Sequence, residues 1–464
     1  MNNHTLWSLR LGFSAKQAET IKRIGLKNFL EHSFATKFDS RIPNLLENSP
    51  KSFKEYNELK KNLKNLSPED AKEIFKKEYQ TSQEMKAWWI DKMTESEFPL
   101  REKMTCFWHN HFVSTYKKVN LNYCIFQHNQ ILRENAFGNF KTLTKKIVQS
   151  NAIVSYLDNN DNKKGKLNEN LSRELLELFT LGIGNYSEND IKNGAKGLAG
   201  LSIGEENAVY QKKFEDNESF YYLGKKGNLK LDEMVDAIFE QPNIPYLITR
   251  KILKWFIYDN PNNELVHYYG DYFKKMNFEI EPLLTKIFTK EFTKNNAGSK
   301  IKNPLEYVLQ LTDELNIQNP NSKLIAHFIT EQGMDLFNQP NVKGWLGGNS
   351  WLTSQIYLQR NNVADLLCKG QYLNQGRKEN KDISMMKQNQ NRLLKVKLHW
   401  DKEGNNEQII AELKDRLLFQ ADETEQHNFE KLLKHDFDSK TEGSENAVIR
   451  LFNFMVKTPE YQLI

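Results

Sequence analysis

Apolar residues recur at every third or fourth position along most of the chain, a spacing typical of amphipathic helices rather than strands. In residues 15–34 this spacing places Ile21, Leu26 and Phe29 on one stripe. Ser67 followed by Pro68 indicates a helix start, because serine caps free backbone amides and proline has no amide to satisfy. The same periodicity predicts further helices at 83–94, 99–113, 123–134, 139–151, 168–181, 187–198, 231–240, 244–258, 265–276, 280–288, 304–315, 324–331, 407–418, 423–433 and 444–456.

Strand-like segments are few. Residues 201–203, 210–214 and 220–223 are short runs between turn formers, which predicts a small antiparallel sheet. A further β-like run occupies 394–400, after a polar stretch at 370–391.

The pattern predicts a mainly α fold, a multi-helix globular fold with a small antiparallel β insertion at about 200–225. The chain then divides into three parts. These are a main helical domain at 1–368, a polar linker or loop at 369–391, and a C-terminal α-rich region at 392–464 packed on the main domain.

Composition supports this fold and narrows the function. Only 22 glycines and 12 prolines occur in 464 residues, which favours long helices. The net charge is +5, and the lysines near residues 58–78 alternate with glutamates, which argues against nucleic-acid binding. Three distant cysteines argue against a disulfide framework or a structural zinc site. No signal peptide or membrane span is visible, so we expect a cytoplasmic protein as written, or a periplasmic or cell-envelope protein if a leader was trimmed.

The segment FWHNHF holds two candidate catalytic histidines, His109 and His111. On a helix two residues apart point about 200° away from each other, so both can bind one metal ion only if the helix unwinds. The simpler interpretation is that each is a buried histidine with one hydrogen bond.

Residues 167–182 (LNENLSRELLELFTLG) hold the highest density of candidate functional side chains in the sequence. Asn170, Arg173, Glu174 and Glu177 share one helix stripe, and the apolar residues beside them are so many that part of this stripe is expected to be buried. Such a cluster is either a structural ion-pair network or an acid/base site with Glu174 and Glu177 as catalytic groups. It can also hold a divalent metal, with His109, His111, Glu169 and Glu174 as candidate ligands.

Residues 337–362 combine glycines with Trp345 and Trp351. Such a segment either holds a ligand between indole rings or plugs a core. Lys343 and Arg360 are candidates for contact with an anionic or sugar-like group.

The order of these motifs resembles the bacterial family called domain of unknown function 1800. The matches run from Arg10-Leu11-Gly12-Phe13 through PLREKMTCFWHNHF, NENLSRELLELFTLGIGNYSENDI, TRKILKWF and FNQPNVKGWLGGNSW to the terminal TPEYQL. The polar set that the family shares includes Arg101, Asp158, Asn159, Asn170 and Arg173, which the resemblance marks as substrate-binding candidates. The chain departs from the family pattern at Leu167, at Ala199-Gly200-Leu201 and at Glu215-Asp216.

The resemblance implies no settled activity, so two hypotheses stay open. In the first, the protein is an enzyme or degenerate enzyme with a buried His/Glu/Arg site, acting hydrolytically on a phosphate-, sulfate- or sugar-bearing substrate. In the second, it is a non-catalytic helical partner or scaffold for a phosphatase/sulfatase-like protein of domain of unknown function family 1501, whose genes often accompany this family. In that case the polar cluster is purely structural.

Overall fold

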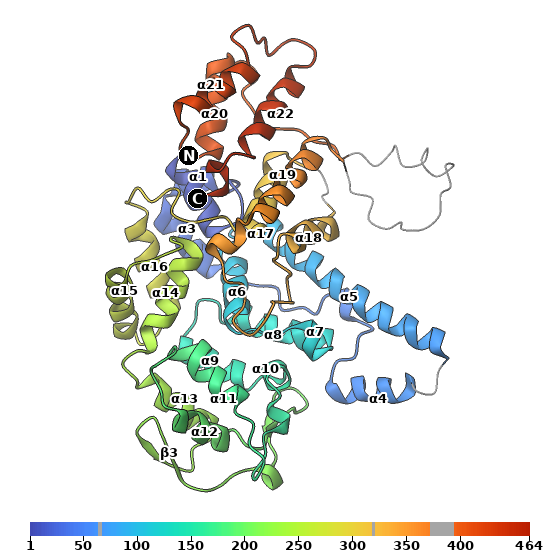
Figure 1. Cartoon of the computed structure of the whole chain (residues 1–464), viewed down its shortest axis with the longest axis vertical. Coiled ribbons are helices and arrows are strands. Elements are labelled where there is room, and N and C mark those ends of the chain that lie inside the picture. The colour runs from blue at the N-terminus through green and yellow to red at the C-terminus, as the bar shows by residue number, and fades with distance from the viewer. Residues whose placement is uncertain (64–66, 318–320, 372–393) are drawn as a thin grey trace.

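A computed structural model describes residues 1–63, 67–317, 321–371 and 394–464, and these ranges are mainly helical, as the periodicity predicts (Figure 1). The N-terminal helices are α1 (Asn3–Leu11), α2 (Ala18–Ile24), α3 (Leu26–Ala35), α4 (Phe53–Leu63), α5 (Pro68–Glu95), α6 (Leu100–His111), α7 (Tyr116–Val119), α8 (Asn122–Glu134), α9 (Phe140–Val148) and α10 (Asn151–Tyr156).

Later helices follow the predicted order closely. The middle of the chain forms α11 (Asn170–Glu174), the π-helical turn η3 (Leu175–Thr180), α12 (Glu188–Gly197), α13 (Leu231–Phe239), α14 (Ile244–Phe256), α15 (Asn263–Lys275) and α16 (Ile280–Glu291). The C-terminal part forms α17 (Pro304–Glu314), α18 (Ser322–Glu331), α19 (Ser354–Cys368), α20 (Asn406–Leu417), α21 (Glu423–Leu432) and α22 (Ser444–Met455).

Two predicted helices are split in the structure. The stretch 15–34 is interrupted at Gly25, which adopts φ +79° and so ends α2 before α3 begins. The stretch 139–151 ends at Val148, and Ser150 then caps α10 by accepting a hydrogen bond from the Ile153 amide. In both cases the break uses a residue type that favours helix ends.

The β insertion lies where it was expected but forms two sheets. β1 (Leu201–Ser202) pairs antiparallel with β2 (Val209–Tyr210), and β3 (Phe220–Tyr222) pairs antiparallel with β4 (Lys225–Gly227). The predicted strand 210–214 is wrong beyond Tyr210, because Lys212–Phe214 is a 3-10 turn.

The predicted β-like run 394–400 is also wrong. Leu394, Leu398 and Trp400 are buried and Val396 is half-buried, which explains the alternating pattern, but the segment pairs with no strand in the described chain. It is an extended segment packed on the core. The predicted linker 369–391 lies almost entirely outside the described residues.

The core consists of two apolar clusters that meet at α6. Met104, Phe107 and Trp108 belong to the first cluster, and Cys106 belongs to the second. Figure 1 places α6 in the middle of the molecule, whereas α4 and the start of α5 extend from it as an arm. Most side chains of α6 are buried among the neighbouring helices.

Both chain ends are tied to distant segments. The Met1 ammonium donates to the Leu418 carbonyl, and Lys300 and Ile464 exchange backbone hydrogen bonds of 3.0 and 2.8 Å. None of the helices in the described ranges has the length and apolar character needed to cross a bilayer.

Candidate functional site

His109 and His111 are both buried and contact different parts of the molecule. His109 Nε2 donates to the Ser114 carbonyl at 3.1 Å, and its Nδ1 accepts from Asn129 at 3.4 Å. His111 Nε2 donates to the Phe179 carbonyl at 3.0 Å, and its Nδ1 accepts from Lys251 Nζ at 3.0 Å. Both nitrogens of each ring are thus engaged within the protein.

Both rings are held in the neutral form. Burial, followed by the neighbouring His128, lowers the pKa of His109 to about 3. Burial and the charge of Lys251 place the pKa of His111 well below its ordinary value. Neither ring is positioned to bind a metal as it stands, because each has one protonated nitrogen and one nitrogen that already accepts a hydrogen bond.

The partners of His111 and Lys251 come from the end of the segment with the densest sequence signal. The predicted helix 168–181 consists of α11 and the π-helical turn η3, and the amides of Leu181 and Gly182 both donate to the Leu176 carbonyl. Carbonyls at the end of a helix have no partner within it. Those of Leu178 and Phe179 accept from Lys251 Nζ at 2.9 Å and from His111.

Beside Lys251 lies a cavity with a volume of about 180 Å³. Pockets for drug-sized ligands usually measure ~300–1,000 Å³, so this one suits a small molecule or the end group of a larger one. Its apolar walls are aromatic and come from Phe107, Trp255, Trp345 and Trp351.

The charges around the cavity are mainly positive. Lys251, Lys254, Lys300 and Lys343 line it, against the single carboxylate of Asp259. Lys300 is paired with buried Glu306 at 2.7 Å, whereas the other three lysines form no ion pair with any carboxylate in the described residues.

Lys251 is the most perturbed of these groups. Its side chain is half-buried, and burial followed by the charge of Lys254 lowers its pKa to about 8. Burial also raises the pKa of Asp259, whose Oδ2 accepts from the Ile301 amide at 2.9 Å. The cavity therefore has an excess of positive charge and a lysine that exchanges its proton near neutral pH.

The Trp345 wall is fixed by Asn110, the middle residue of the HNH segment. Asn110 Oδ1 accepts from the Trp345 amide at 2.6 Å, and its Nδ2 donates to the Trp345 carbonyl at 3.3 Å. Gly344 adopts φ +75°, and a Cβ there would lie 2.3 Å from Asn110 Oδ1. The close approach of loop and helix thus requires glycine at this position. The loop is shorter than the predicted segment 337–362, because α19 begins at Ser354.

The polar stripe of α11 and η3 lies along the rim of the core and is partly buried, in agreement with the prediction: Arg173, Glu174 and Glu177 are half-buried. Arg173 pairs with Glu169 and Glu188 at 3.1 Å each, and its side chain is 36% exposed. The apolar stripe of Leu171 and Leu175 faces the core, so the polar stripe is left along the rim. Asn170 is exposed.

Glu174 and Glu177 lie nearer the cavity without lining it. Burial and then the charge of Glu177 raise the pKa of Glu174, and Lys343 acts against this shift. Glu177 accepts from the Tyr186 hydroxyl at 3.1 Å. The predicted His and Glu metal set is not brought together, and no group of three or more His, Cys, Asp or Glu side chains within the described ranges is placed to share a metal ion.

The other predicted binding residues have partners within the fold. Arg101 donates to the carbonyls of Phe34, Thr36 and Arg133, and buried Arg360 donates to Gln462 and to the Lys302 carbonyl. Asp158 pairs with Lys118 at 2.9 Å, and Asn159 donates to the carbonyls of Leu198 and Leu201. Of the residues singled out from sequence, His111, Lys343, Trp345 and Trp351 line the cavity.

Sequence reasoning did not select Lys251, Lys254 or Asn110. In TRKILKWF the two lysines stand three apart beside the buried stripe of Ile252, Leu253 and Phe256, a pattern that exposed lysines share. The one sequence feature that could have pointed to these lysines is the place of TRKILKWF among the motifs of the family resemblance.

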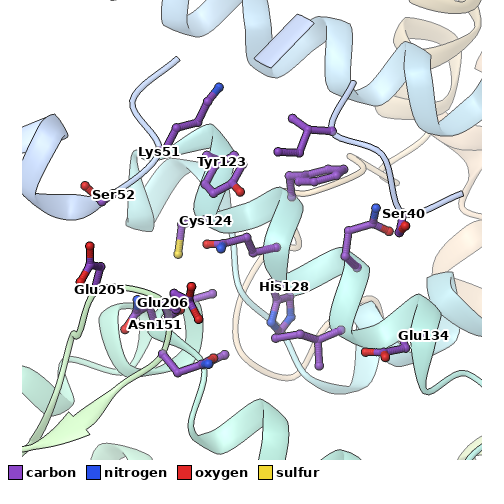
Figure 2. A pocket seen from close by; sticks show the side chains of 18 of the residues that line it. Ser40, Lys51, Ser52, Tyr123, Cys124, His128, Glu134, Asn151, Glu205 and Glu206 are labelled. Carbon is purple, nitrogen blue, oxygen red and sulfur yellow. Dashed lines mark hydrogen bonds between the residues drawn. The ribbon is translucent and has the colours of Figure 1, made fainter. Parts of the chain in front are cut away.

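A second, wider cavity of about 700 Å³ lies beside α8 (Figure 2). Figure 2 shows Tyr123, Cys124 and His128 on one helix, across from the loop of Glu205 and Glu206. These two glutamates are exposed, and burial lowers the pKa of His128 to about 4. No residue predicted for the site lines this cavity, whereas His111, Lys343 and Trp345 line the cavity beside Lys251. The cavity beside Lys251 is therefore the stronger candidate site.

The family model described as "Protein of unknown function (DUF1800)" matches residues 4–463. No curated protein and no solved structure matches the chain.

Proposed function

Because the chain belongs to the DUF1800 family, whose function is unknown, we propose a function from the geometry of the site: the protein binds a small molecule with a phosphate, sulfate or carboxylate group in the cavity beside Lys251. One observation carries the proposal. Lys251, Lys254 and Lys343 line this cavity and form no ion pair with a carboxylate in the described chain, although Lys343 acts on Glu174 and Lys254 on Asp259 at longer range.

A bound anion would supply the negative charge that the lysines around the cavity lack. The charge of Lys254 acts against that of half-buried Lys251, and exposed Lys343 lines the same space. An anion bound there relieves the repulsion between Lys251 and Lys254 and accepts charge-assisted hydrogen bonds. The indole rings of Trp345 and Trp351 offer flat apolar walls for an aromatic or sugar-ring body. The cavity thus combines one charged subsite with an apolar surface, as ligand pockets commonly do.

This proposal keeps the phosphate- or sulfate-bearing compounds of the enzyme hypothesis, adds carboxylates, and changes the residues that bind them. Lys251 becomes the group that holds or releases a proton, since the lowered pKa of about 8 lies near physiological pH. Hydrolysis by Glu174 or Glu177, and the alternative role as a scaffold for a phosphatase/sulfatase-like protein, stay predictions. The surface ion pairs of Arg173 fit a structural role for that side chain.

Calorimetric titration with sodium sulfate and with pyrophosphate tests the proposal. We expect saturable binding to one site, weakened several-fold in Lys343→Ala, since one ammonium near the anion is lost. Lys275→Ala is the matched control, because Lys275 is exposed on α15 and does not line the cavity. Binding that is undetectable, or equally weakened by both substitutions, would refute the proposal.

A further inference from the structure

Lys251 is held in a geometry that suits more than charge attraction. Its Nζ donates one hydrogen to the Leu178 carbonyl at 2.9 Å and a second to His111 Nδ1 at 3.0 Å. Both acceptors are neutral, so neither holds the lysine in its charged form as a carboxylate would.

The fourth substituent position on Lys251 Nζ determines whether this nitrogen can react. A tetrahedral nitrogen has four substituent positions, and here Cε and the two donated hydrogens occupy three of them. The fourth carries a third hydrogen in the ammonium form and the lone pair in the amine form. Lys251 lines the cavity, so we infer that this position is open to a molecule bound there.

Burial and then the charge of Lys254 favour the amine form of Lys251. Lys254 on the same helix, Lys343 on the Trp345 loop and buried Lys300 all face the cavity, whereas Asp259 opposes them and the His111 ring is neutral. Burial, followed by Lys254, lowers the pKa of Lys251 from 10.5 to about 8. The ratio of amine to ammonium is then about 300-fold higher than for an ordinary lysine at the same pH.

We propose that Lys251 forms an imine with a small aldehyde or ketone that carries an anionic group, a step that rests on anion binding in the same cavity. The Nζ lone pair attacks the carbonyl carbon and forms a C–N bond. The C–O bond then breaks, and the oxygen leaves as water with both amine hydrogens. No oxidant or reductant is needed.

The cavity selects for such a compound. Lys254 and Lys343 attract its anionic group, and the volume of about 180 Å³ excludes large carbonyl compounds. If the imine takes up a proton, its single N–H keeps one of the two hydrogen bonds, to Leu178 or to His111, so the product is held where the amine was.

Reductive trapping tests the imine on the whole wild-type chain. The protein is incubated with glyoxylate and sodium cyanoborohydride for increasing times, and the carboxymethylated lysines are mapped by peptide mass spectrometry. We expect Lys251 to be modified at least about tenfold faster than Lys275, because its amine is more abundant at neutral pH. Added sulfate is expected to slow the modification of Lys251 alone.

Two lysine variants, together with sulfate binding measured by calorimetry, test whether the imine forms at Lys251. Lys251→Arg keeps the charge and removes the reactive amine, so the fast phase should vanish, whereas Lys275→Arg should leave it unchanged. If sulfate binds by calorimetry but wild-type Lys251 reacts no faster than Lys275, the imine proposal is overturned and anion binding stands. If sulfate neither binds nor protects and Lys251 is unreactive, both proposals are overturned.

Discussion

Replacing Glu306 by glutamine removes the carboxylate that pairs with two buried lysines, Lys103 and Lys300, beside the cavity. Glu306 is fully buried, and its two oxygens lie 2.8 Å from Lys103 Nζ and 2.7 Å from Lys300 Nζ. Burial alone would raise the pKa of Glu306, but the charges of Lys103 and Lys300 outweigh it and lower the pKa to about 2. The variant Glu306→Gln leaves both lysines buried without a counter-charge.

The pKa shift of Glu306 gives the size of the expected loss of stability. A change from 4.5 to about 2 in the pKa of Glu306 corresponds to ~3 kcal/mol of free energy of unfolding, at about 1.4 kcal/mol per pKa unit. Breaking buried ion pairs typically costs ~3–5 kcal/mol, which agrees. The folded-state pKa is lowered, so this stabilisation is complete above about pH 4.5 and is lost as the pH falls toward 2.

Urea unfolding followed by tryptophan fluorescence measures the effect. At neutral pH the midpoint of Glu306→Gln should fall well below that of wild type, with the gap narrowing only below about pH 4.5. Glu264→Gln, at an exposed position of α15, is the control and should unfold like wild type. A midpoint for Glu306→Gln that matches the control would refute the assigned role of this network.

Three further predictions concern the cavity and its rim. Gly344→Ala should destabilise the protein by ~2 kcal/mol or more and weaken sulfate binding, because its Cβ would lie 2.3 Å from Asn110 Oδ1 at φ +75°; thermal unfolding and calorimetry check both. Sulfate affinity should fall as the pH rises from about 7 to about 9, because Lys251 loses its charge near its pKa of about 8, and a flat profile in wild type would contradict this. Lys251→Met should remove that dependence. Arg173→Ala should leave the melting temperature nearly unchanged, because its ion pairs are solvent-exposed. A loss of stability comparable to that of Glu306→Gln would show that these ion pairs help to hold the fold.

The helices were predictable because their apolar stripes must face a core, whatever the function. The three C-terminal helices start within one residue of the predicted positions, where Asn405 and Asp422 provide caps for α20 and α21. The break at Gly25 was missed because the apolar stripe continues across it, from Ile21 to Leu26 and Phe29. The segment 394–400 was predicted as β-like because its alternating burial resembles that of a strand.

The site was less predictable, for a physical reason. The densest polar motif contributes to the cavity through the backbone carbonyls of Leu178 and Phe179, which any side chains at those positions would supply. The π-helical turn that ends this segment has no signature in residue type. Lys251 resembles an exposed lysine in sequence, and only the fold shows that it is half-buried against His111.

The central claim is that an anion binds between Lys251, Lys254 and Lys343. The most direct measurement is an anomalous difference map from crystals of the protein soaked in sodium selenate, a close analogue of sulfate. The account predicts a selenium peak inside the cavity, placed so that a selenate oxygen accepts a hydrogen bond from Lys251 Nζ, and this peak is absent from crystals of Lys251→Met. Selenium peaks confined to other surfaces, with the cavity empty in wild type, would contradict it.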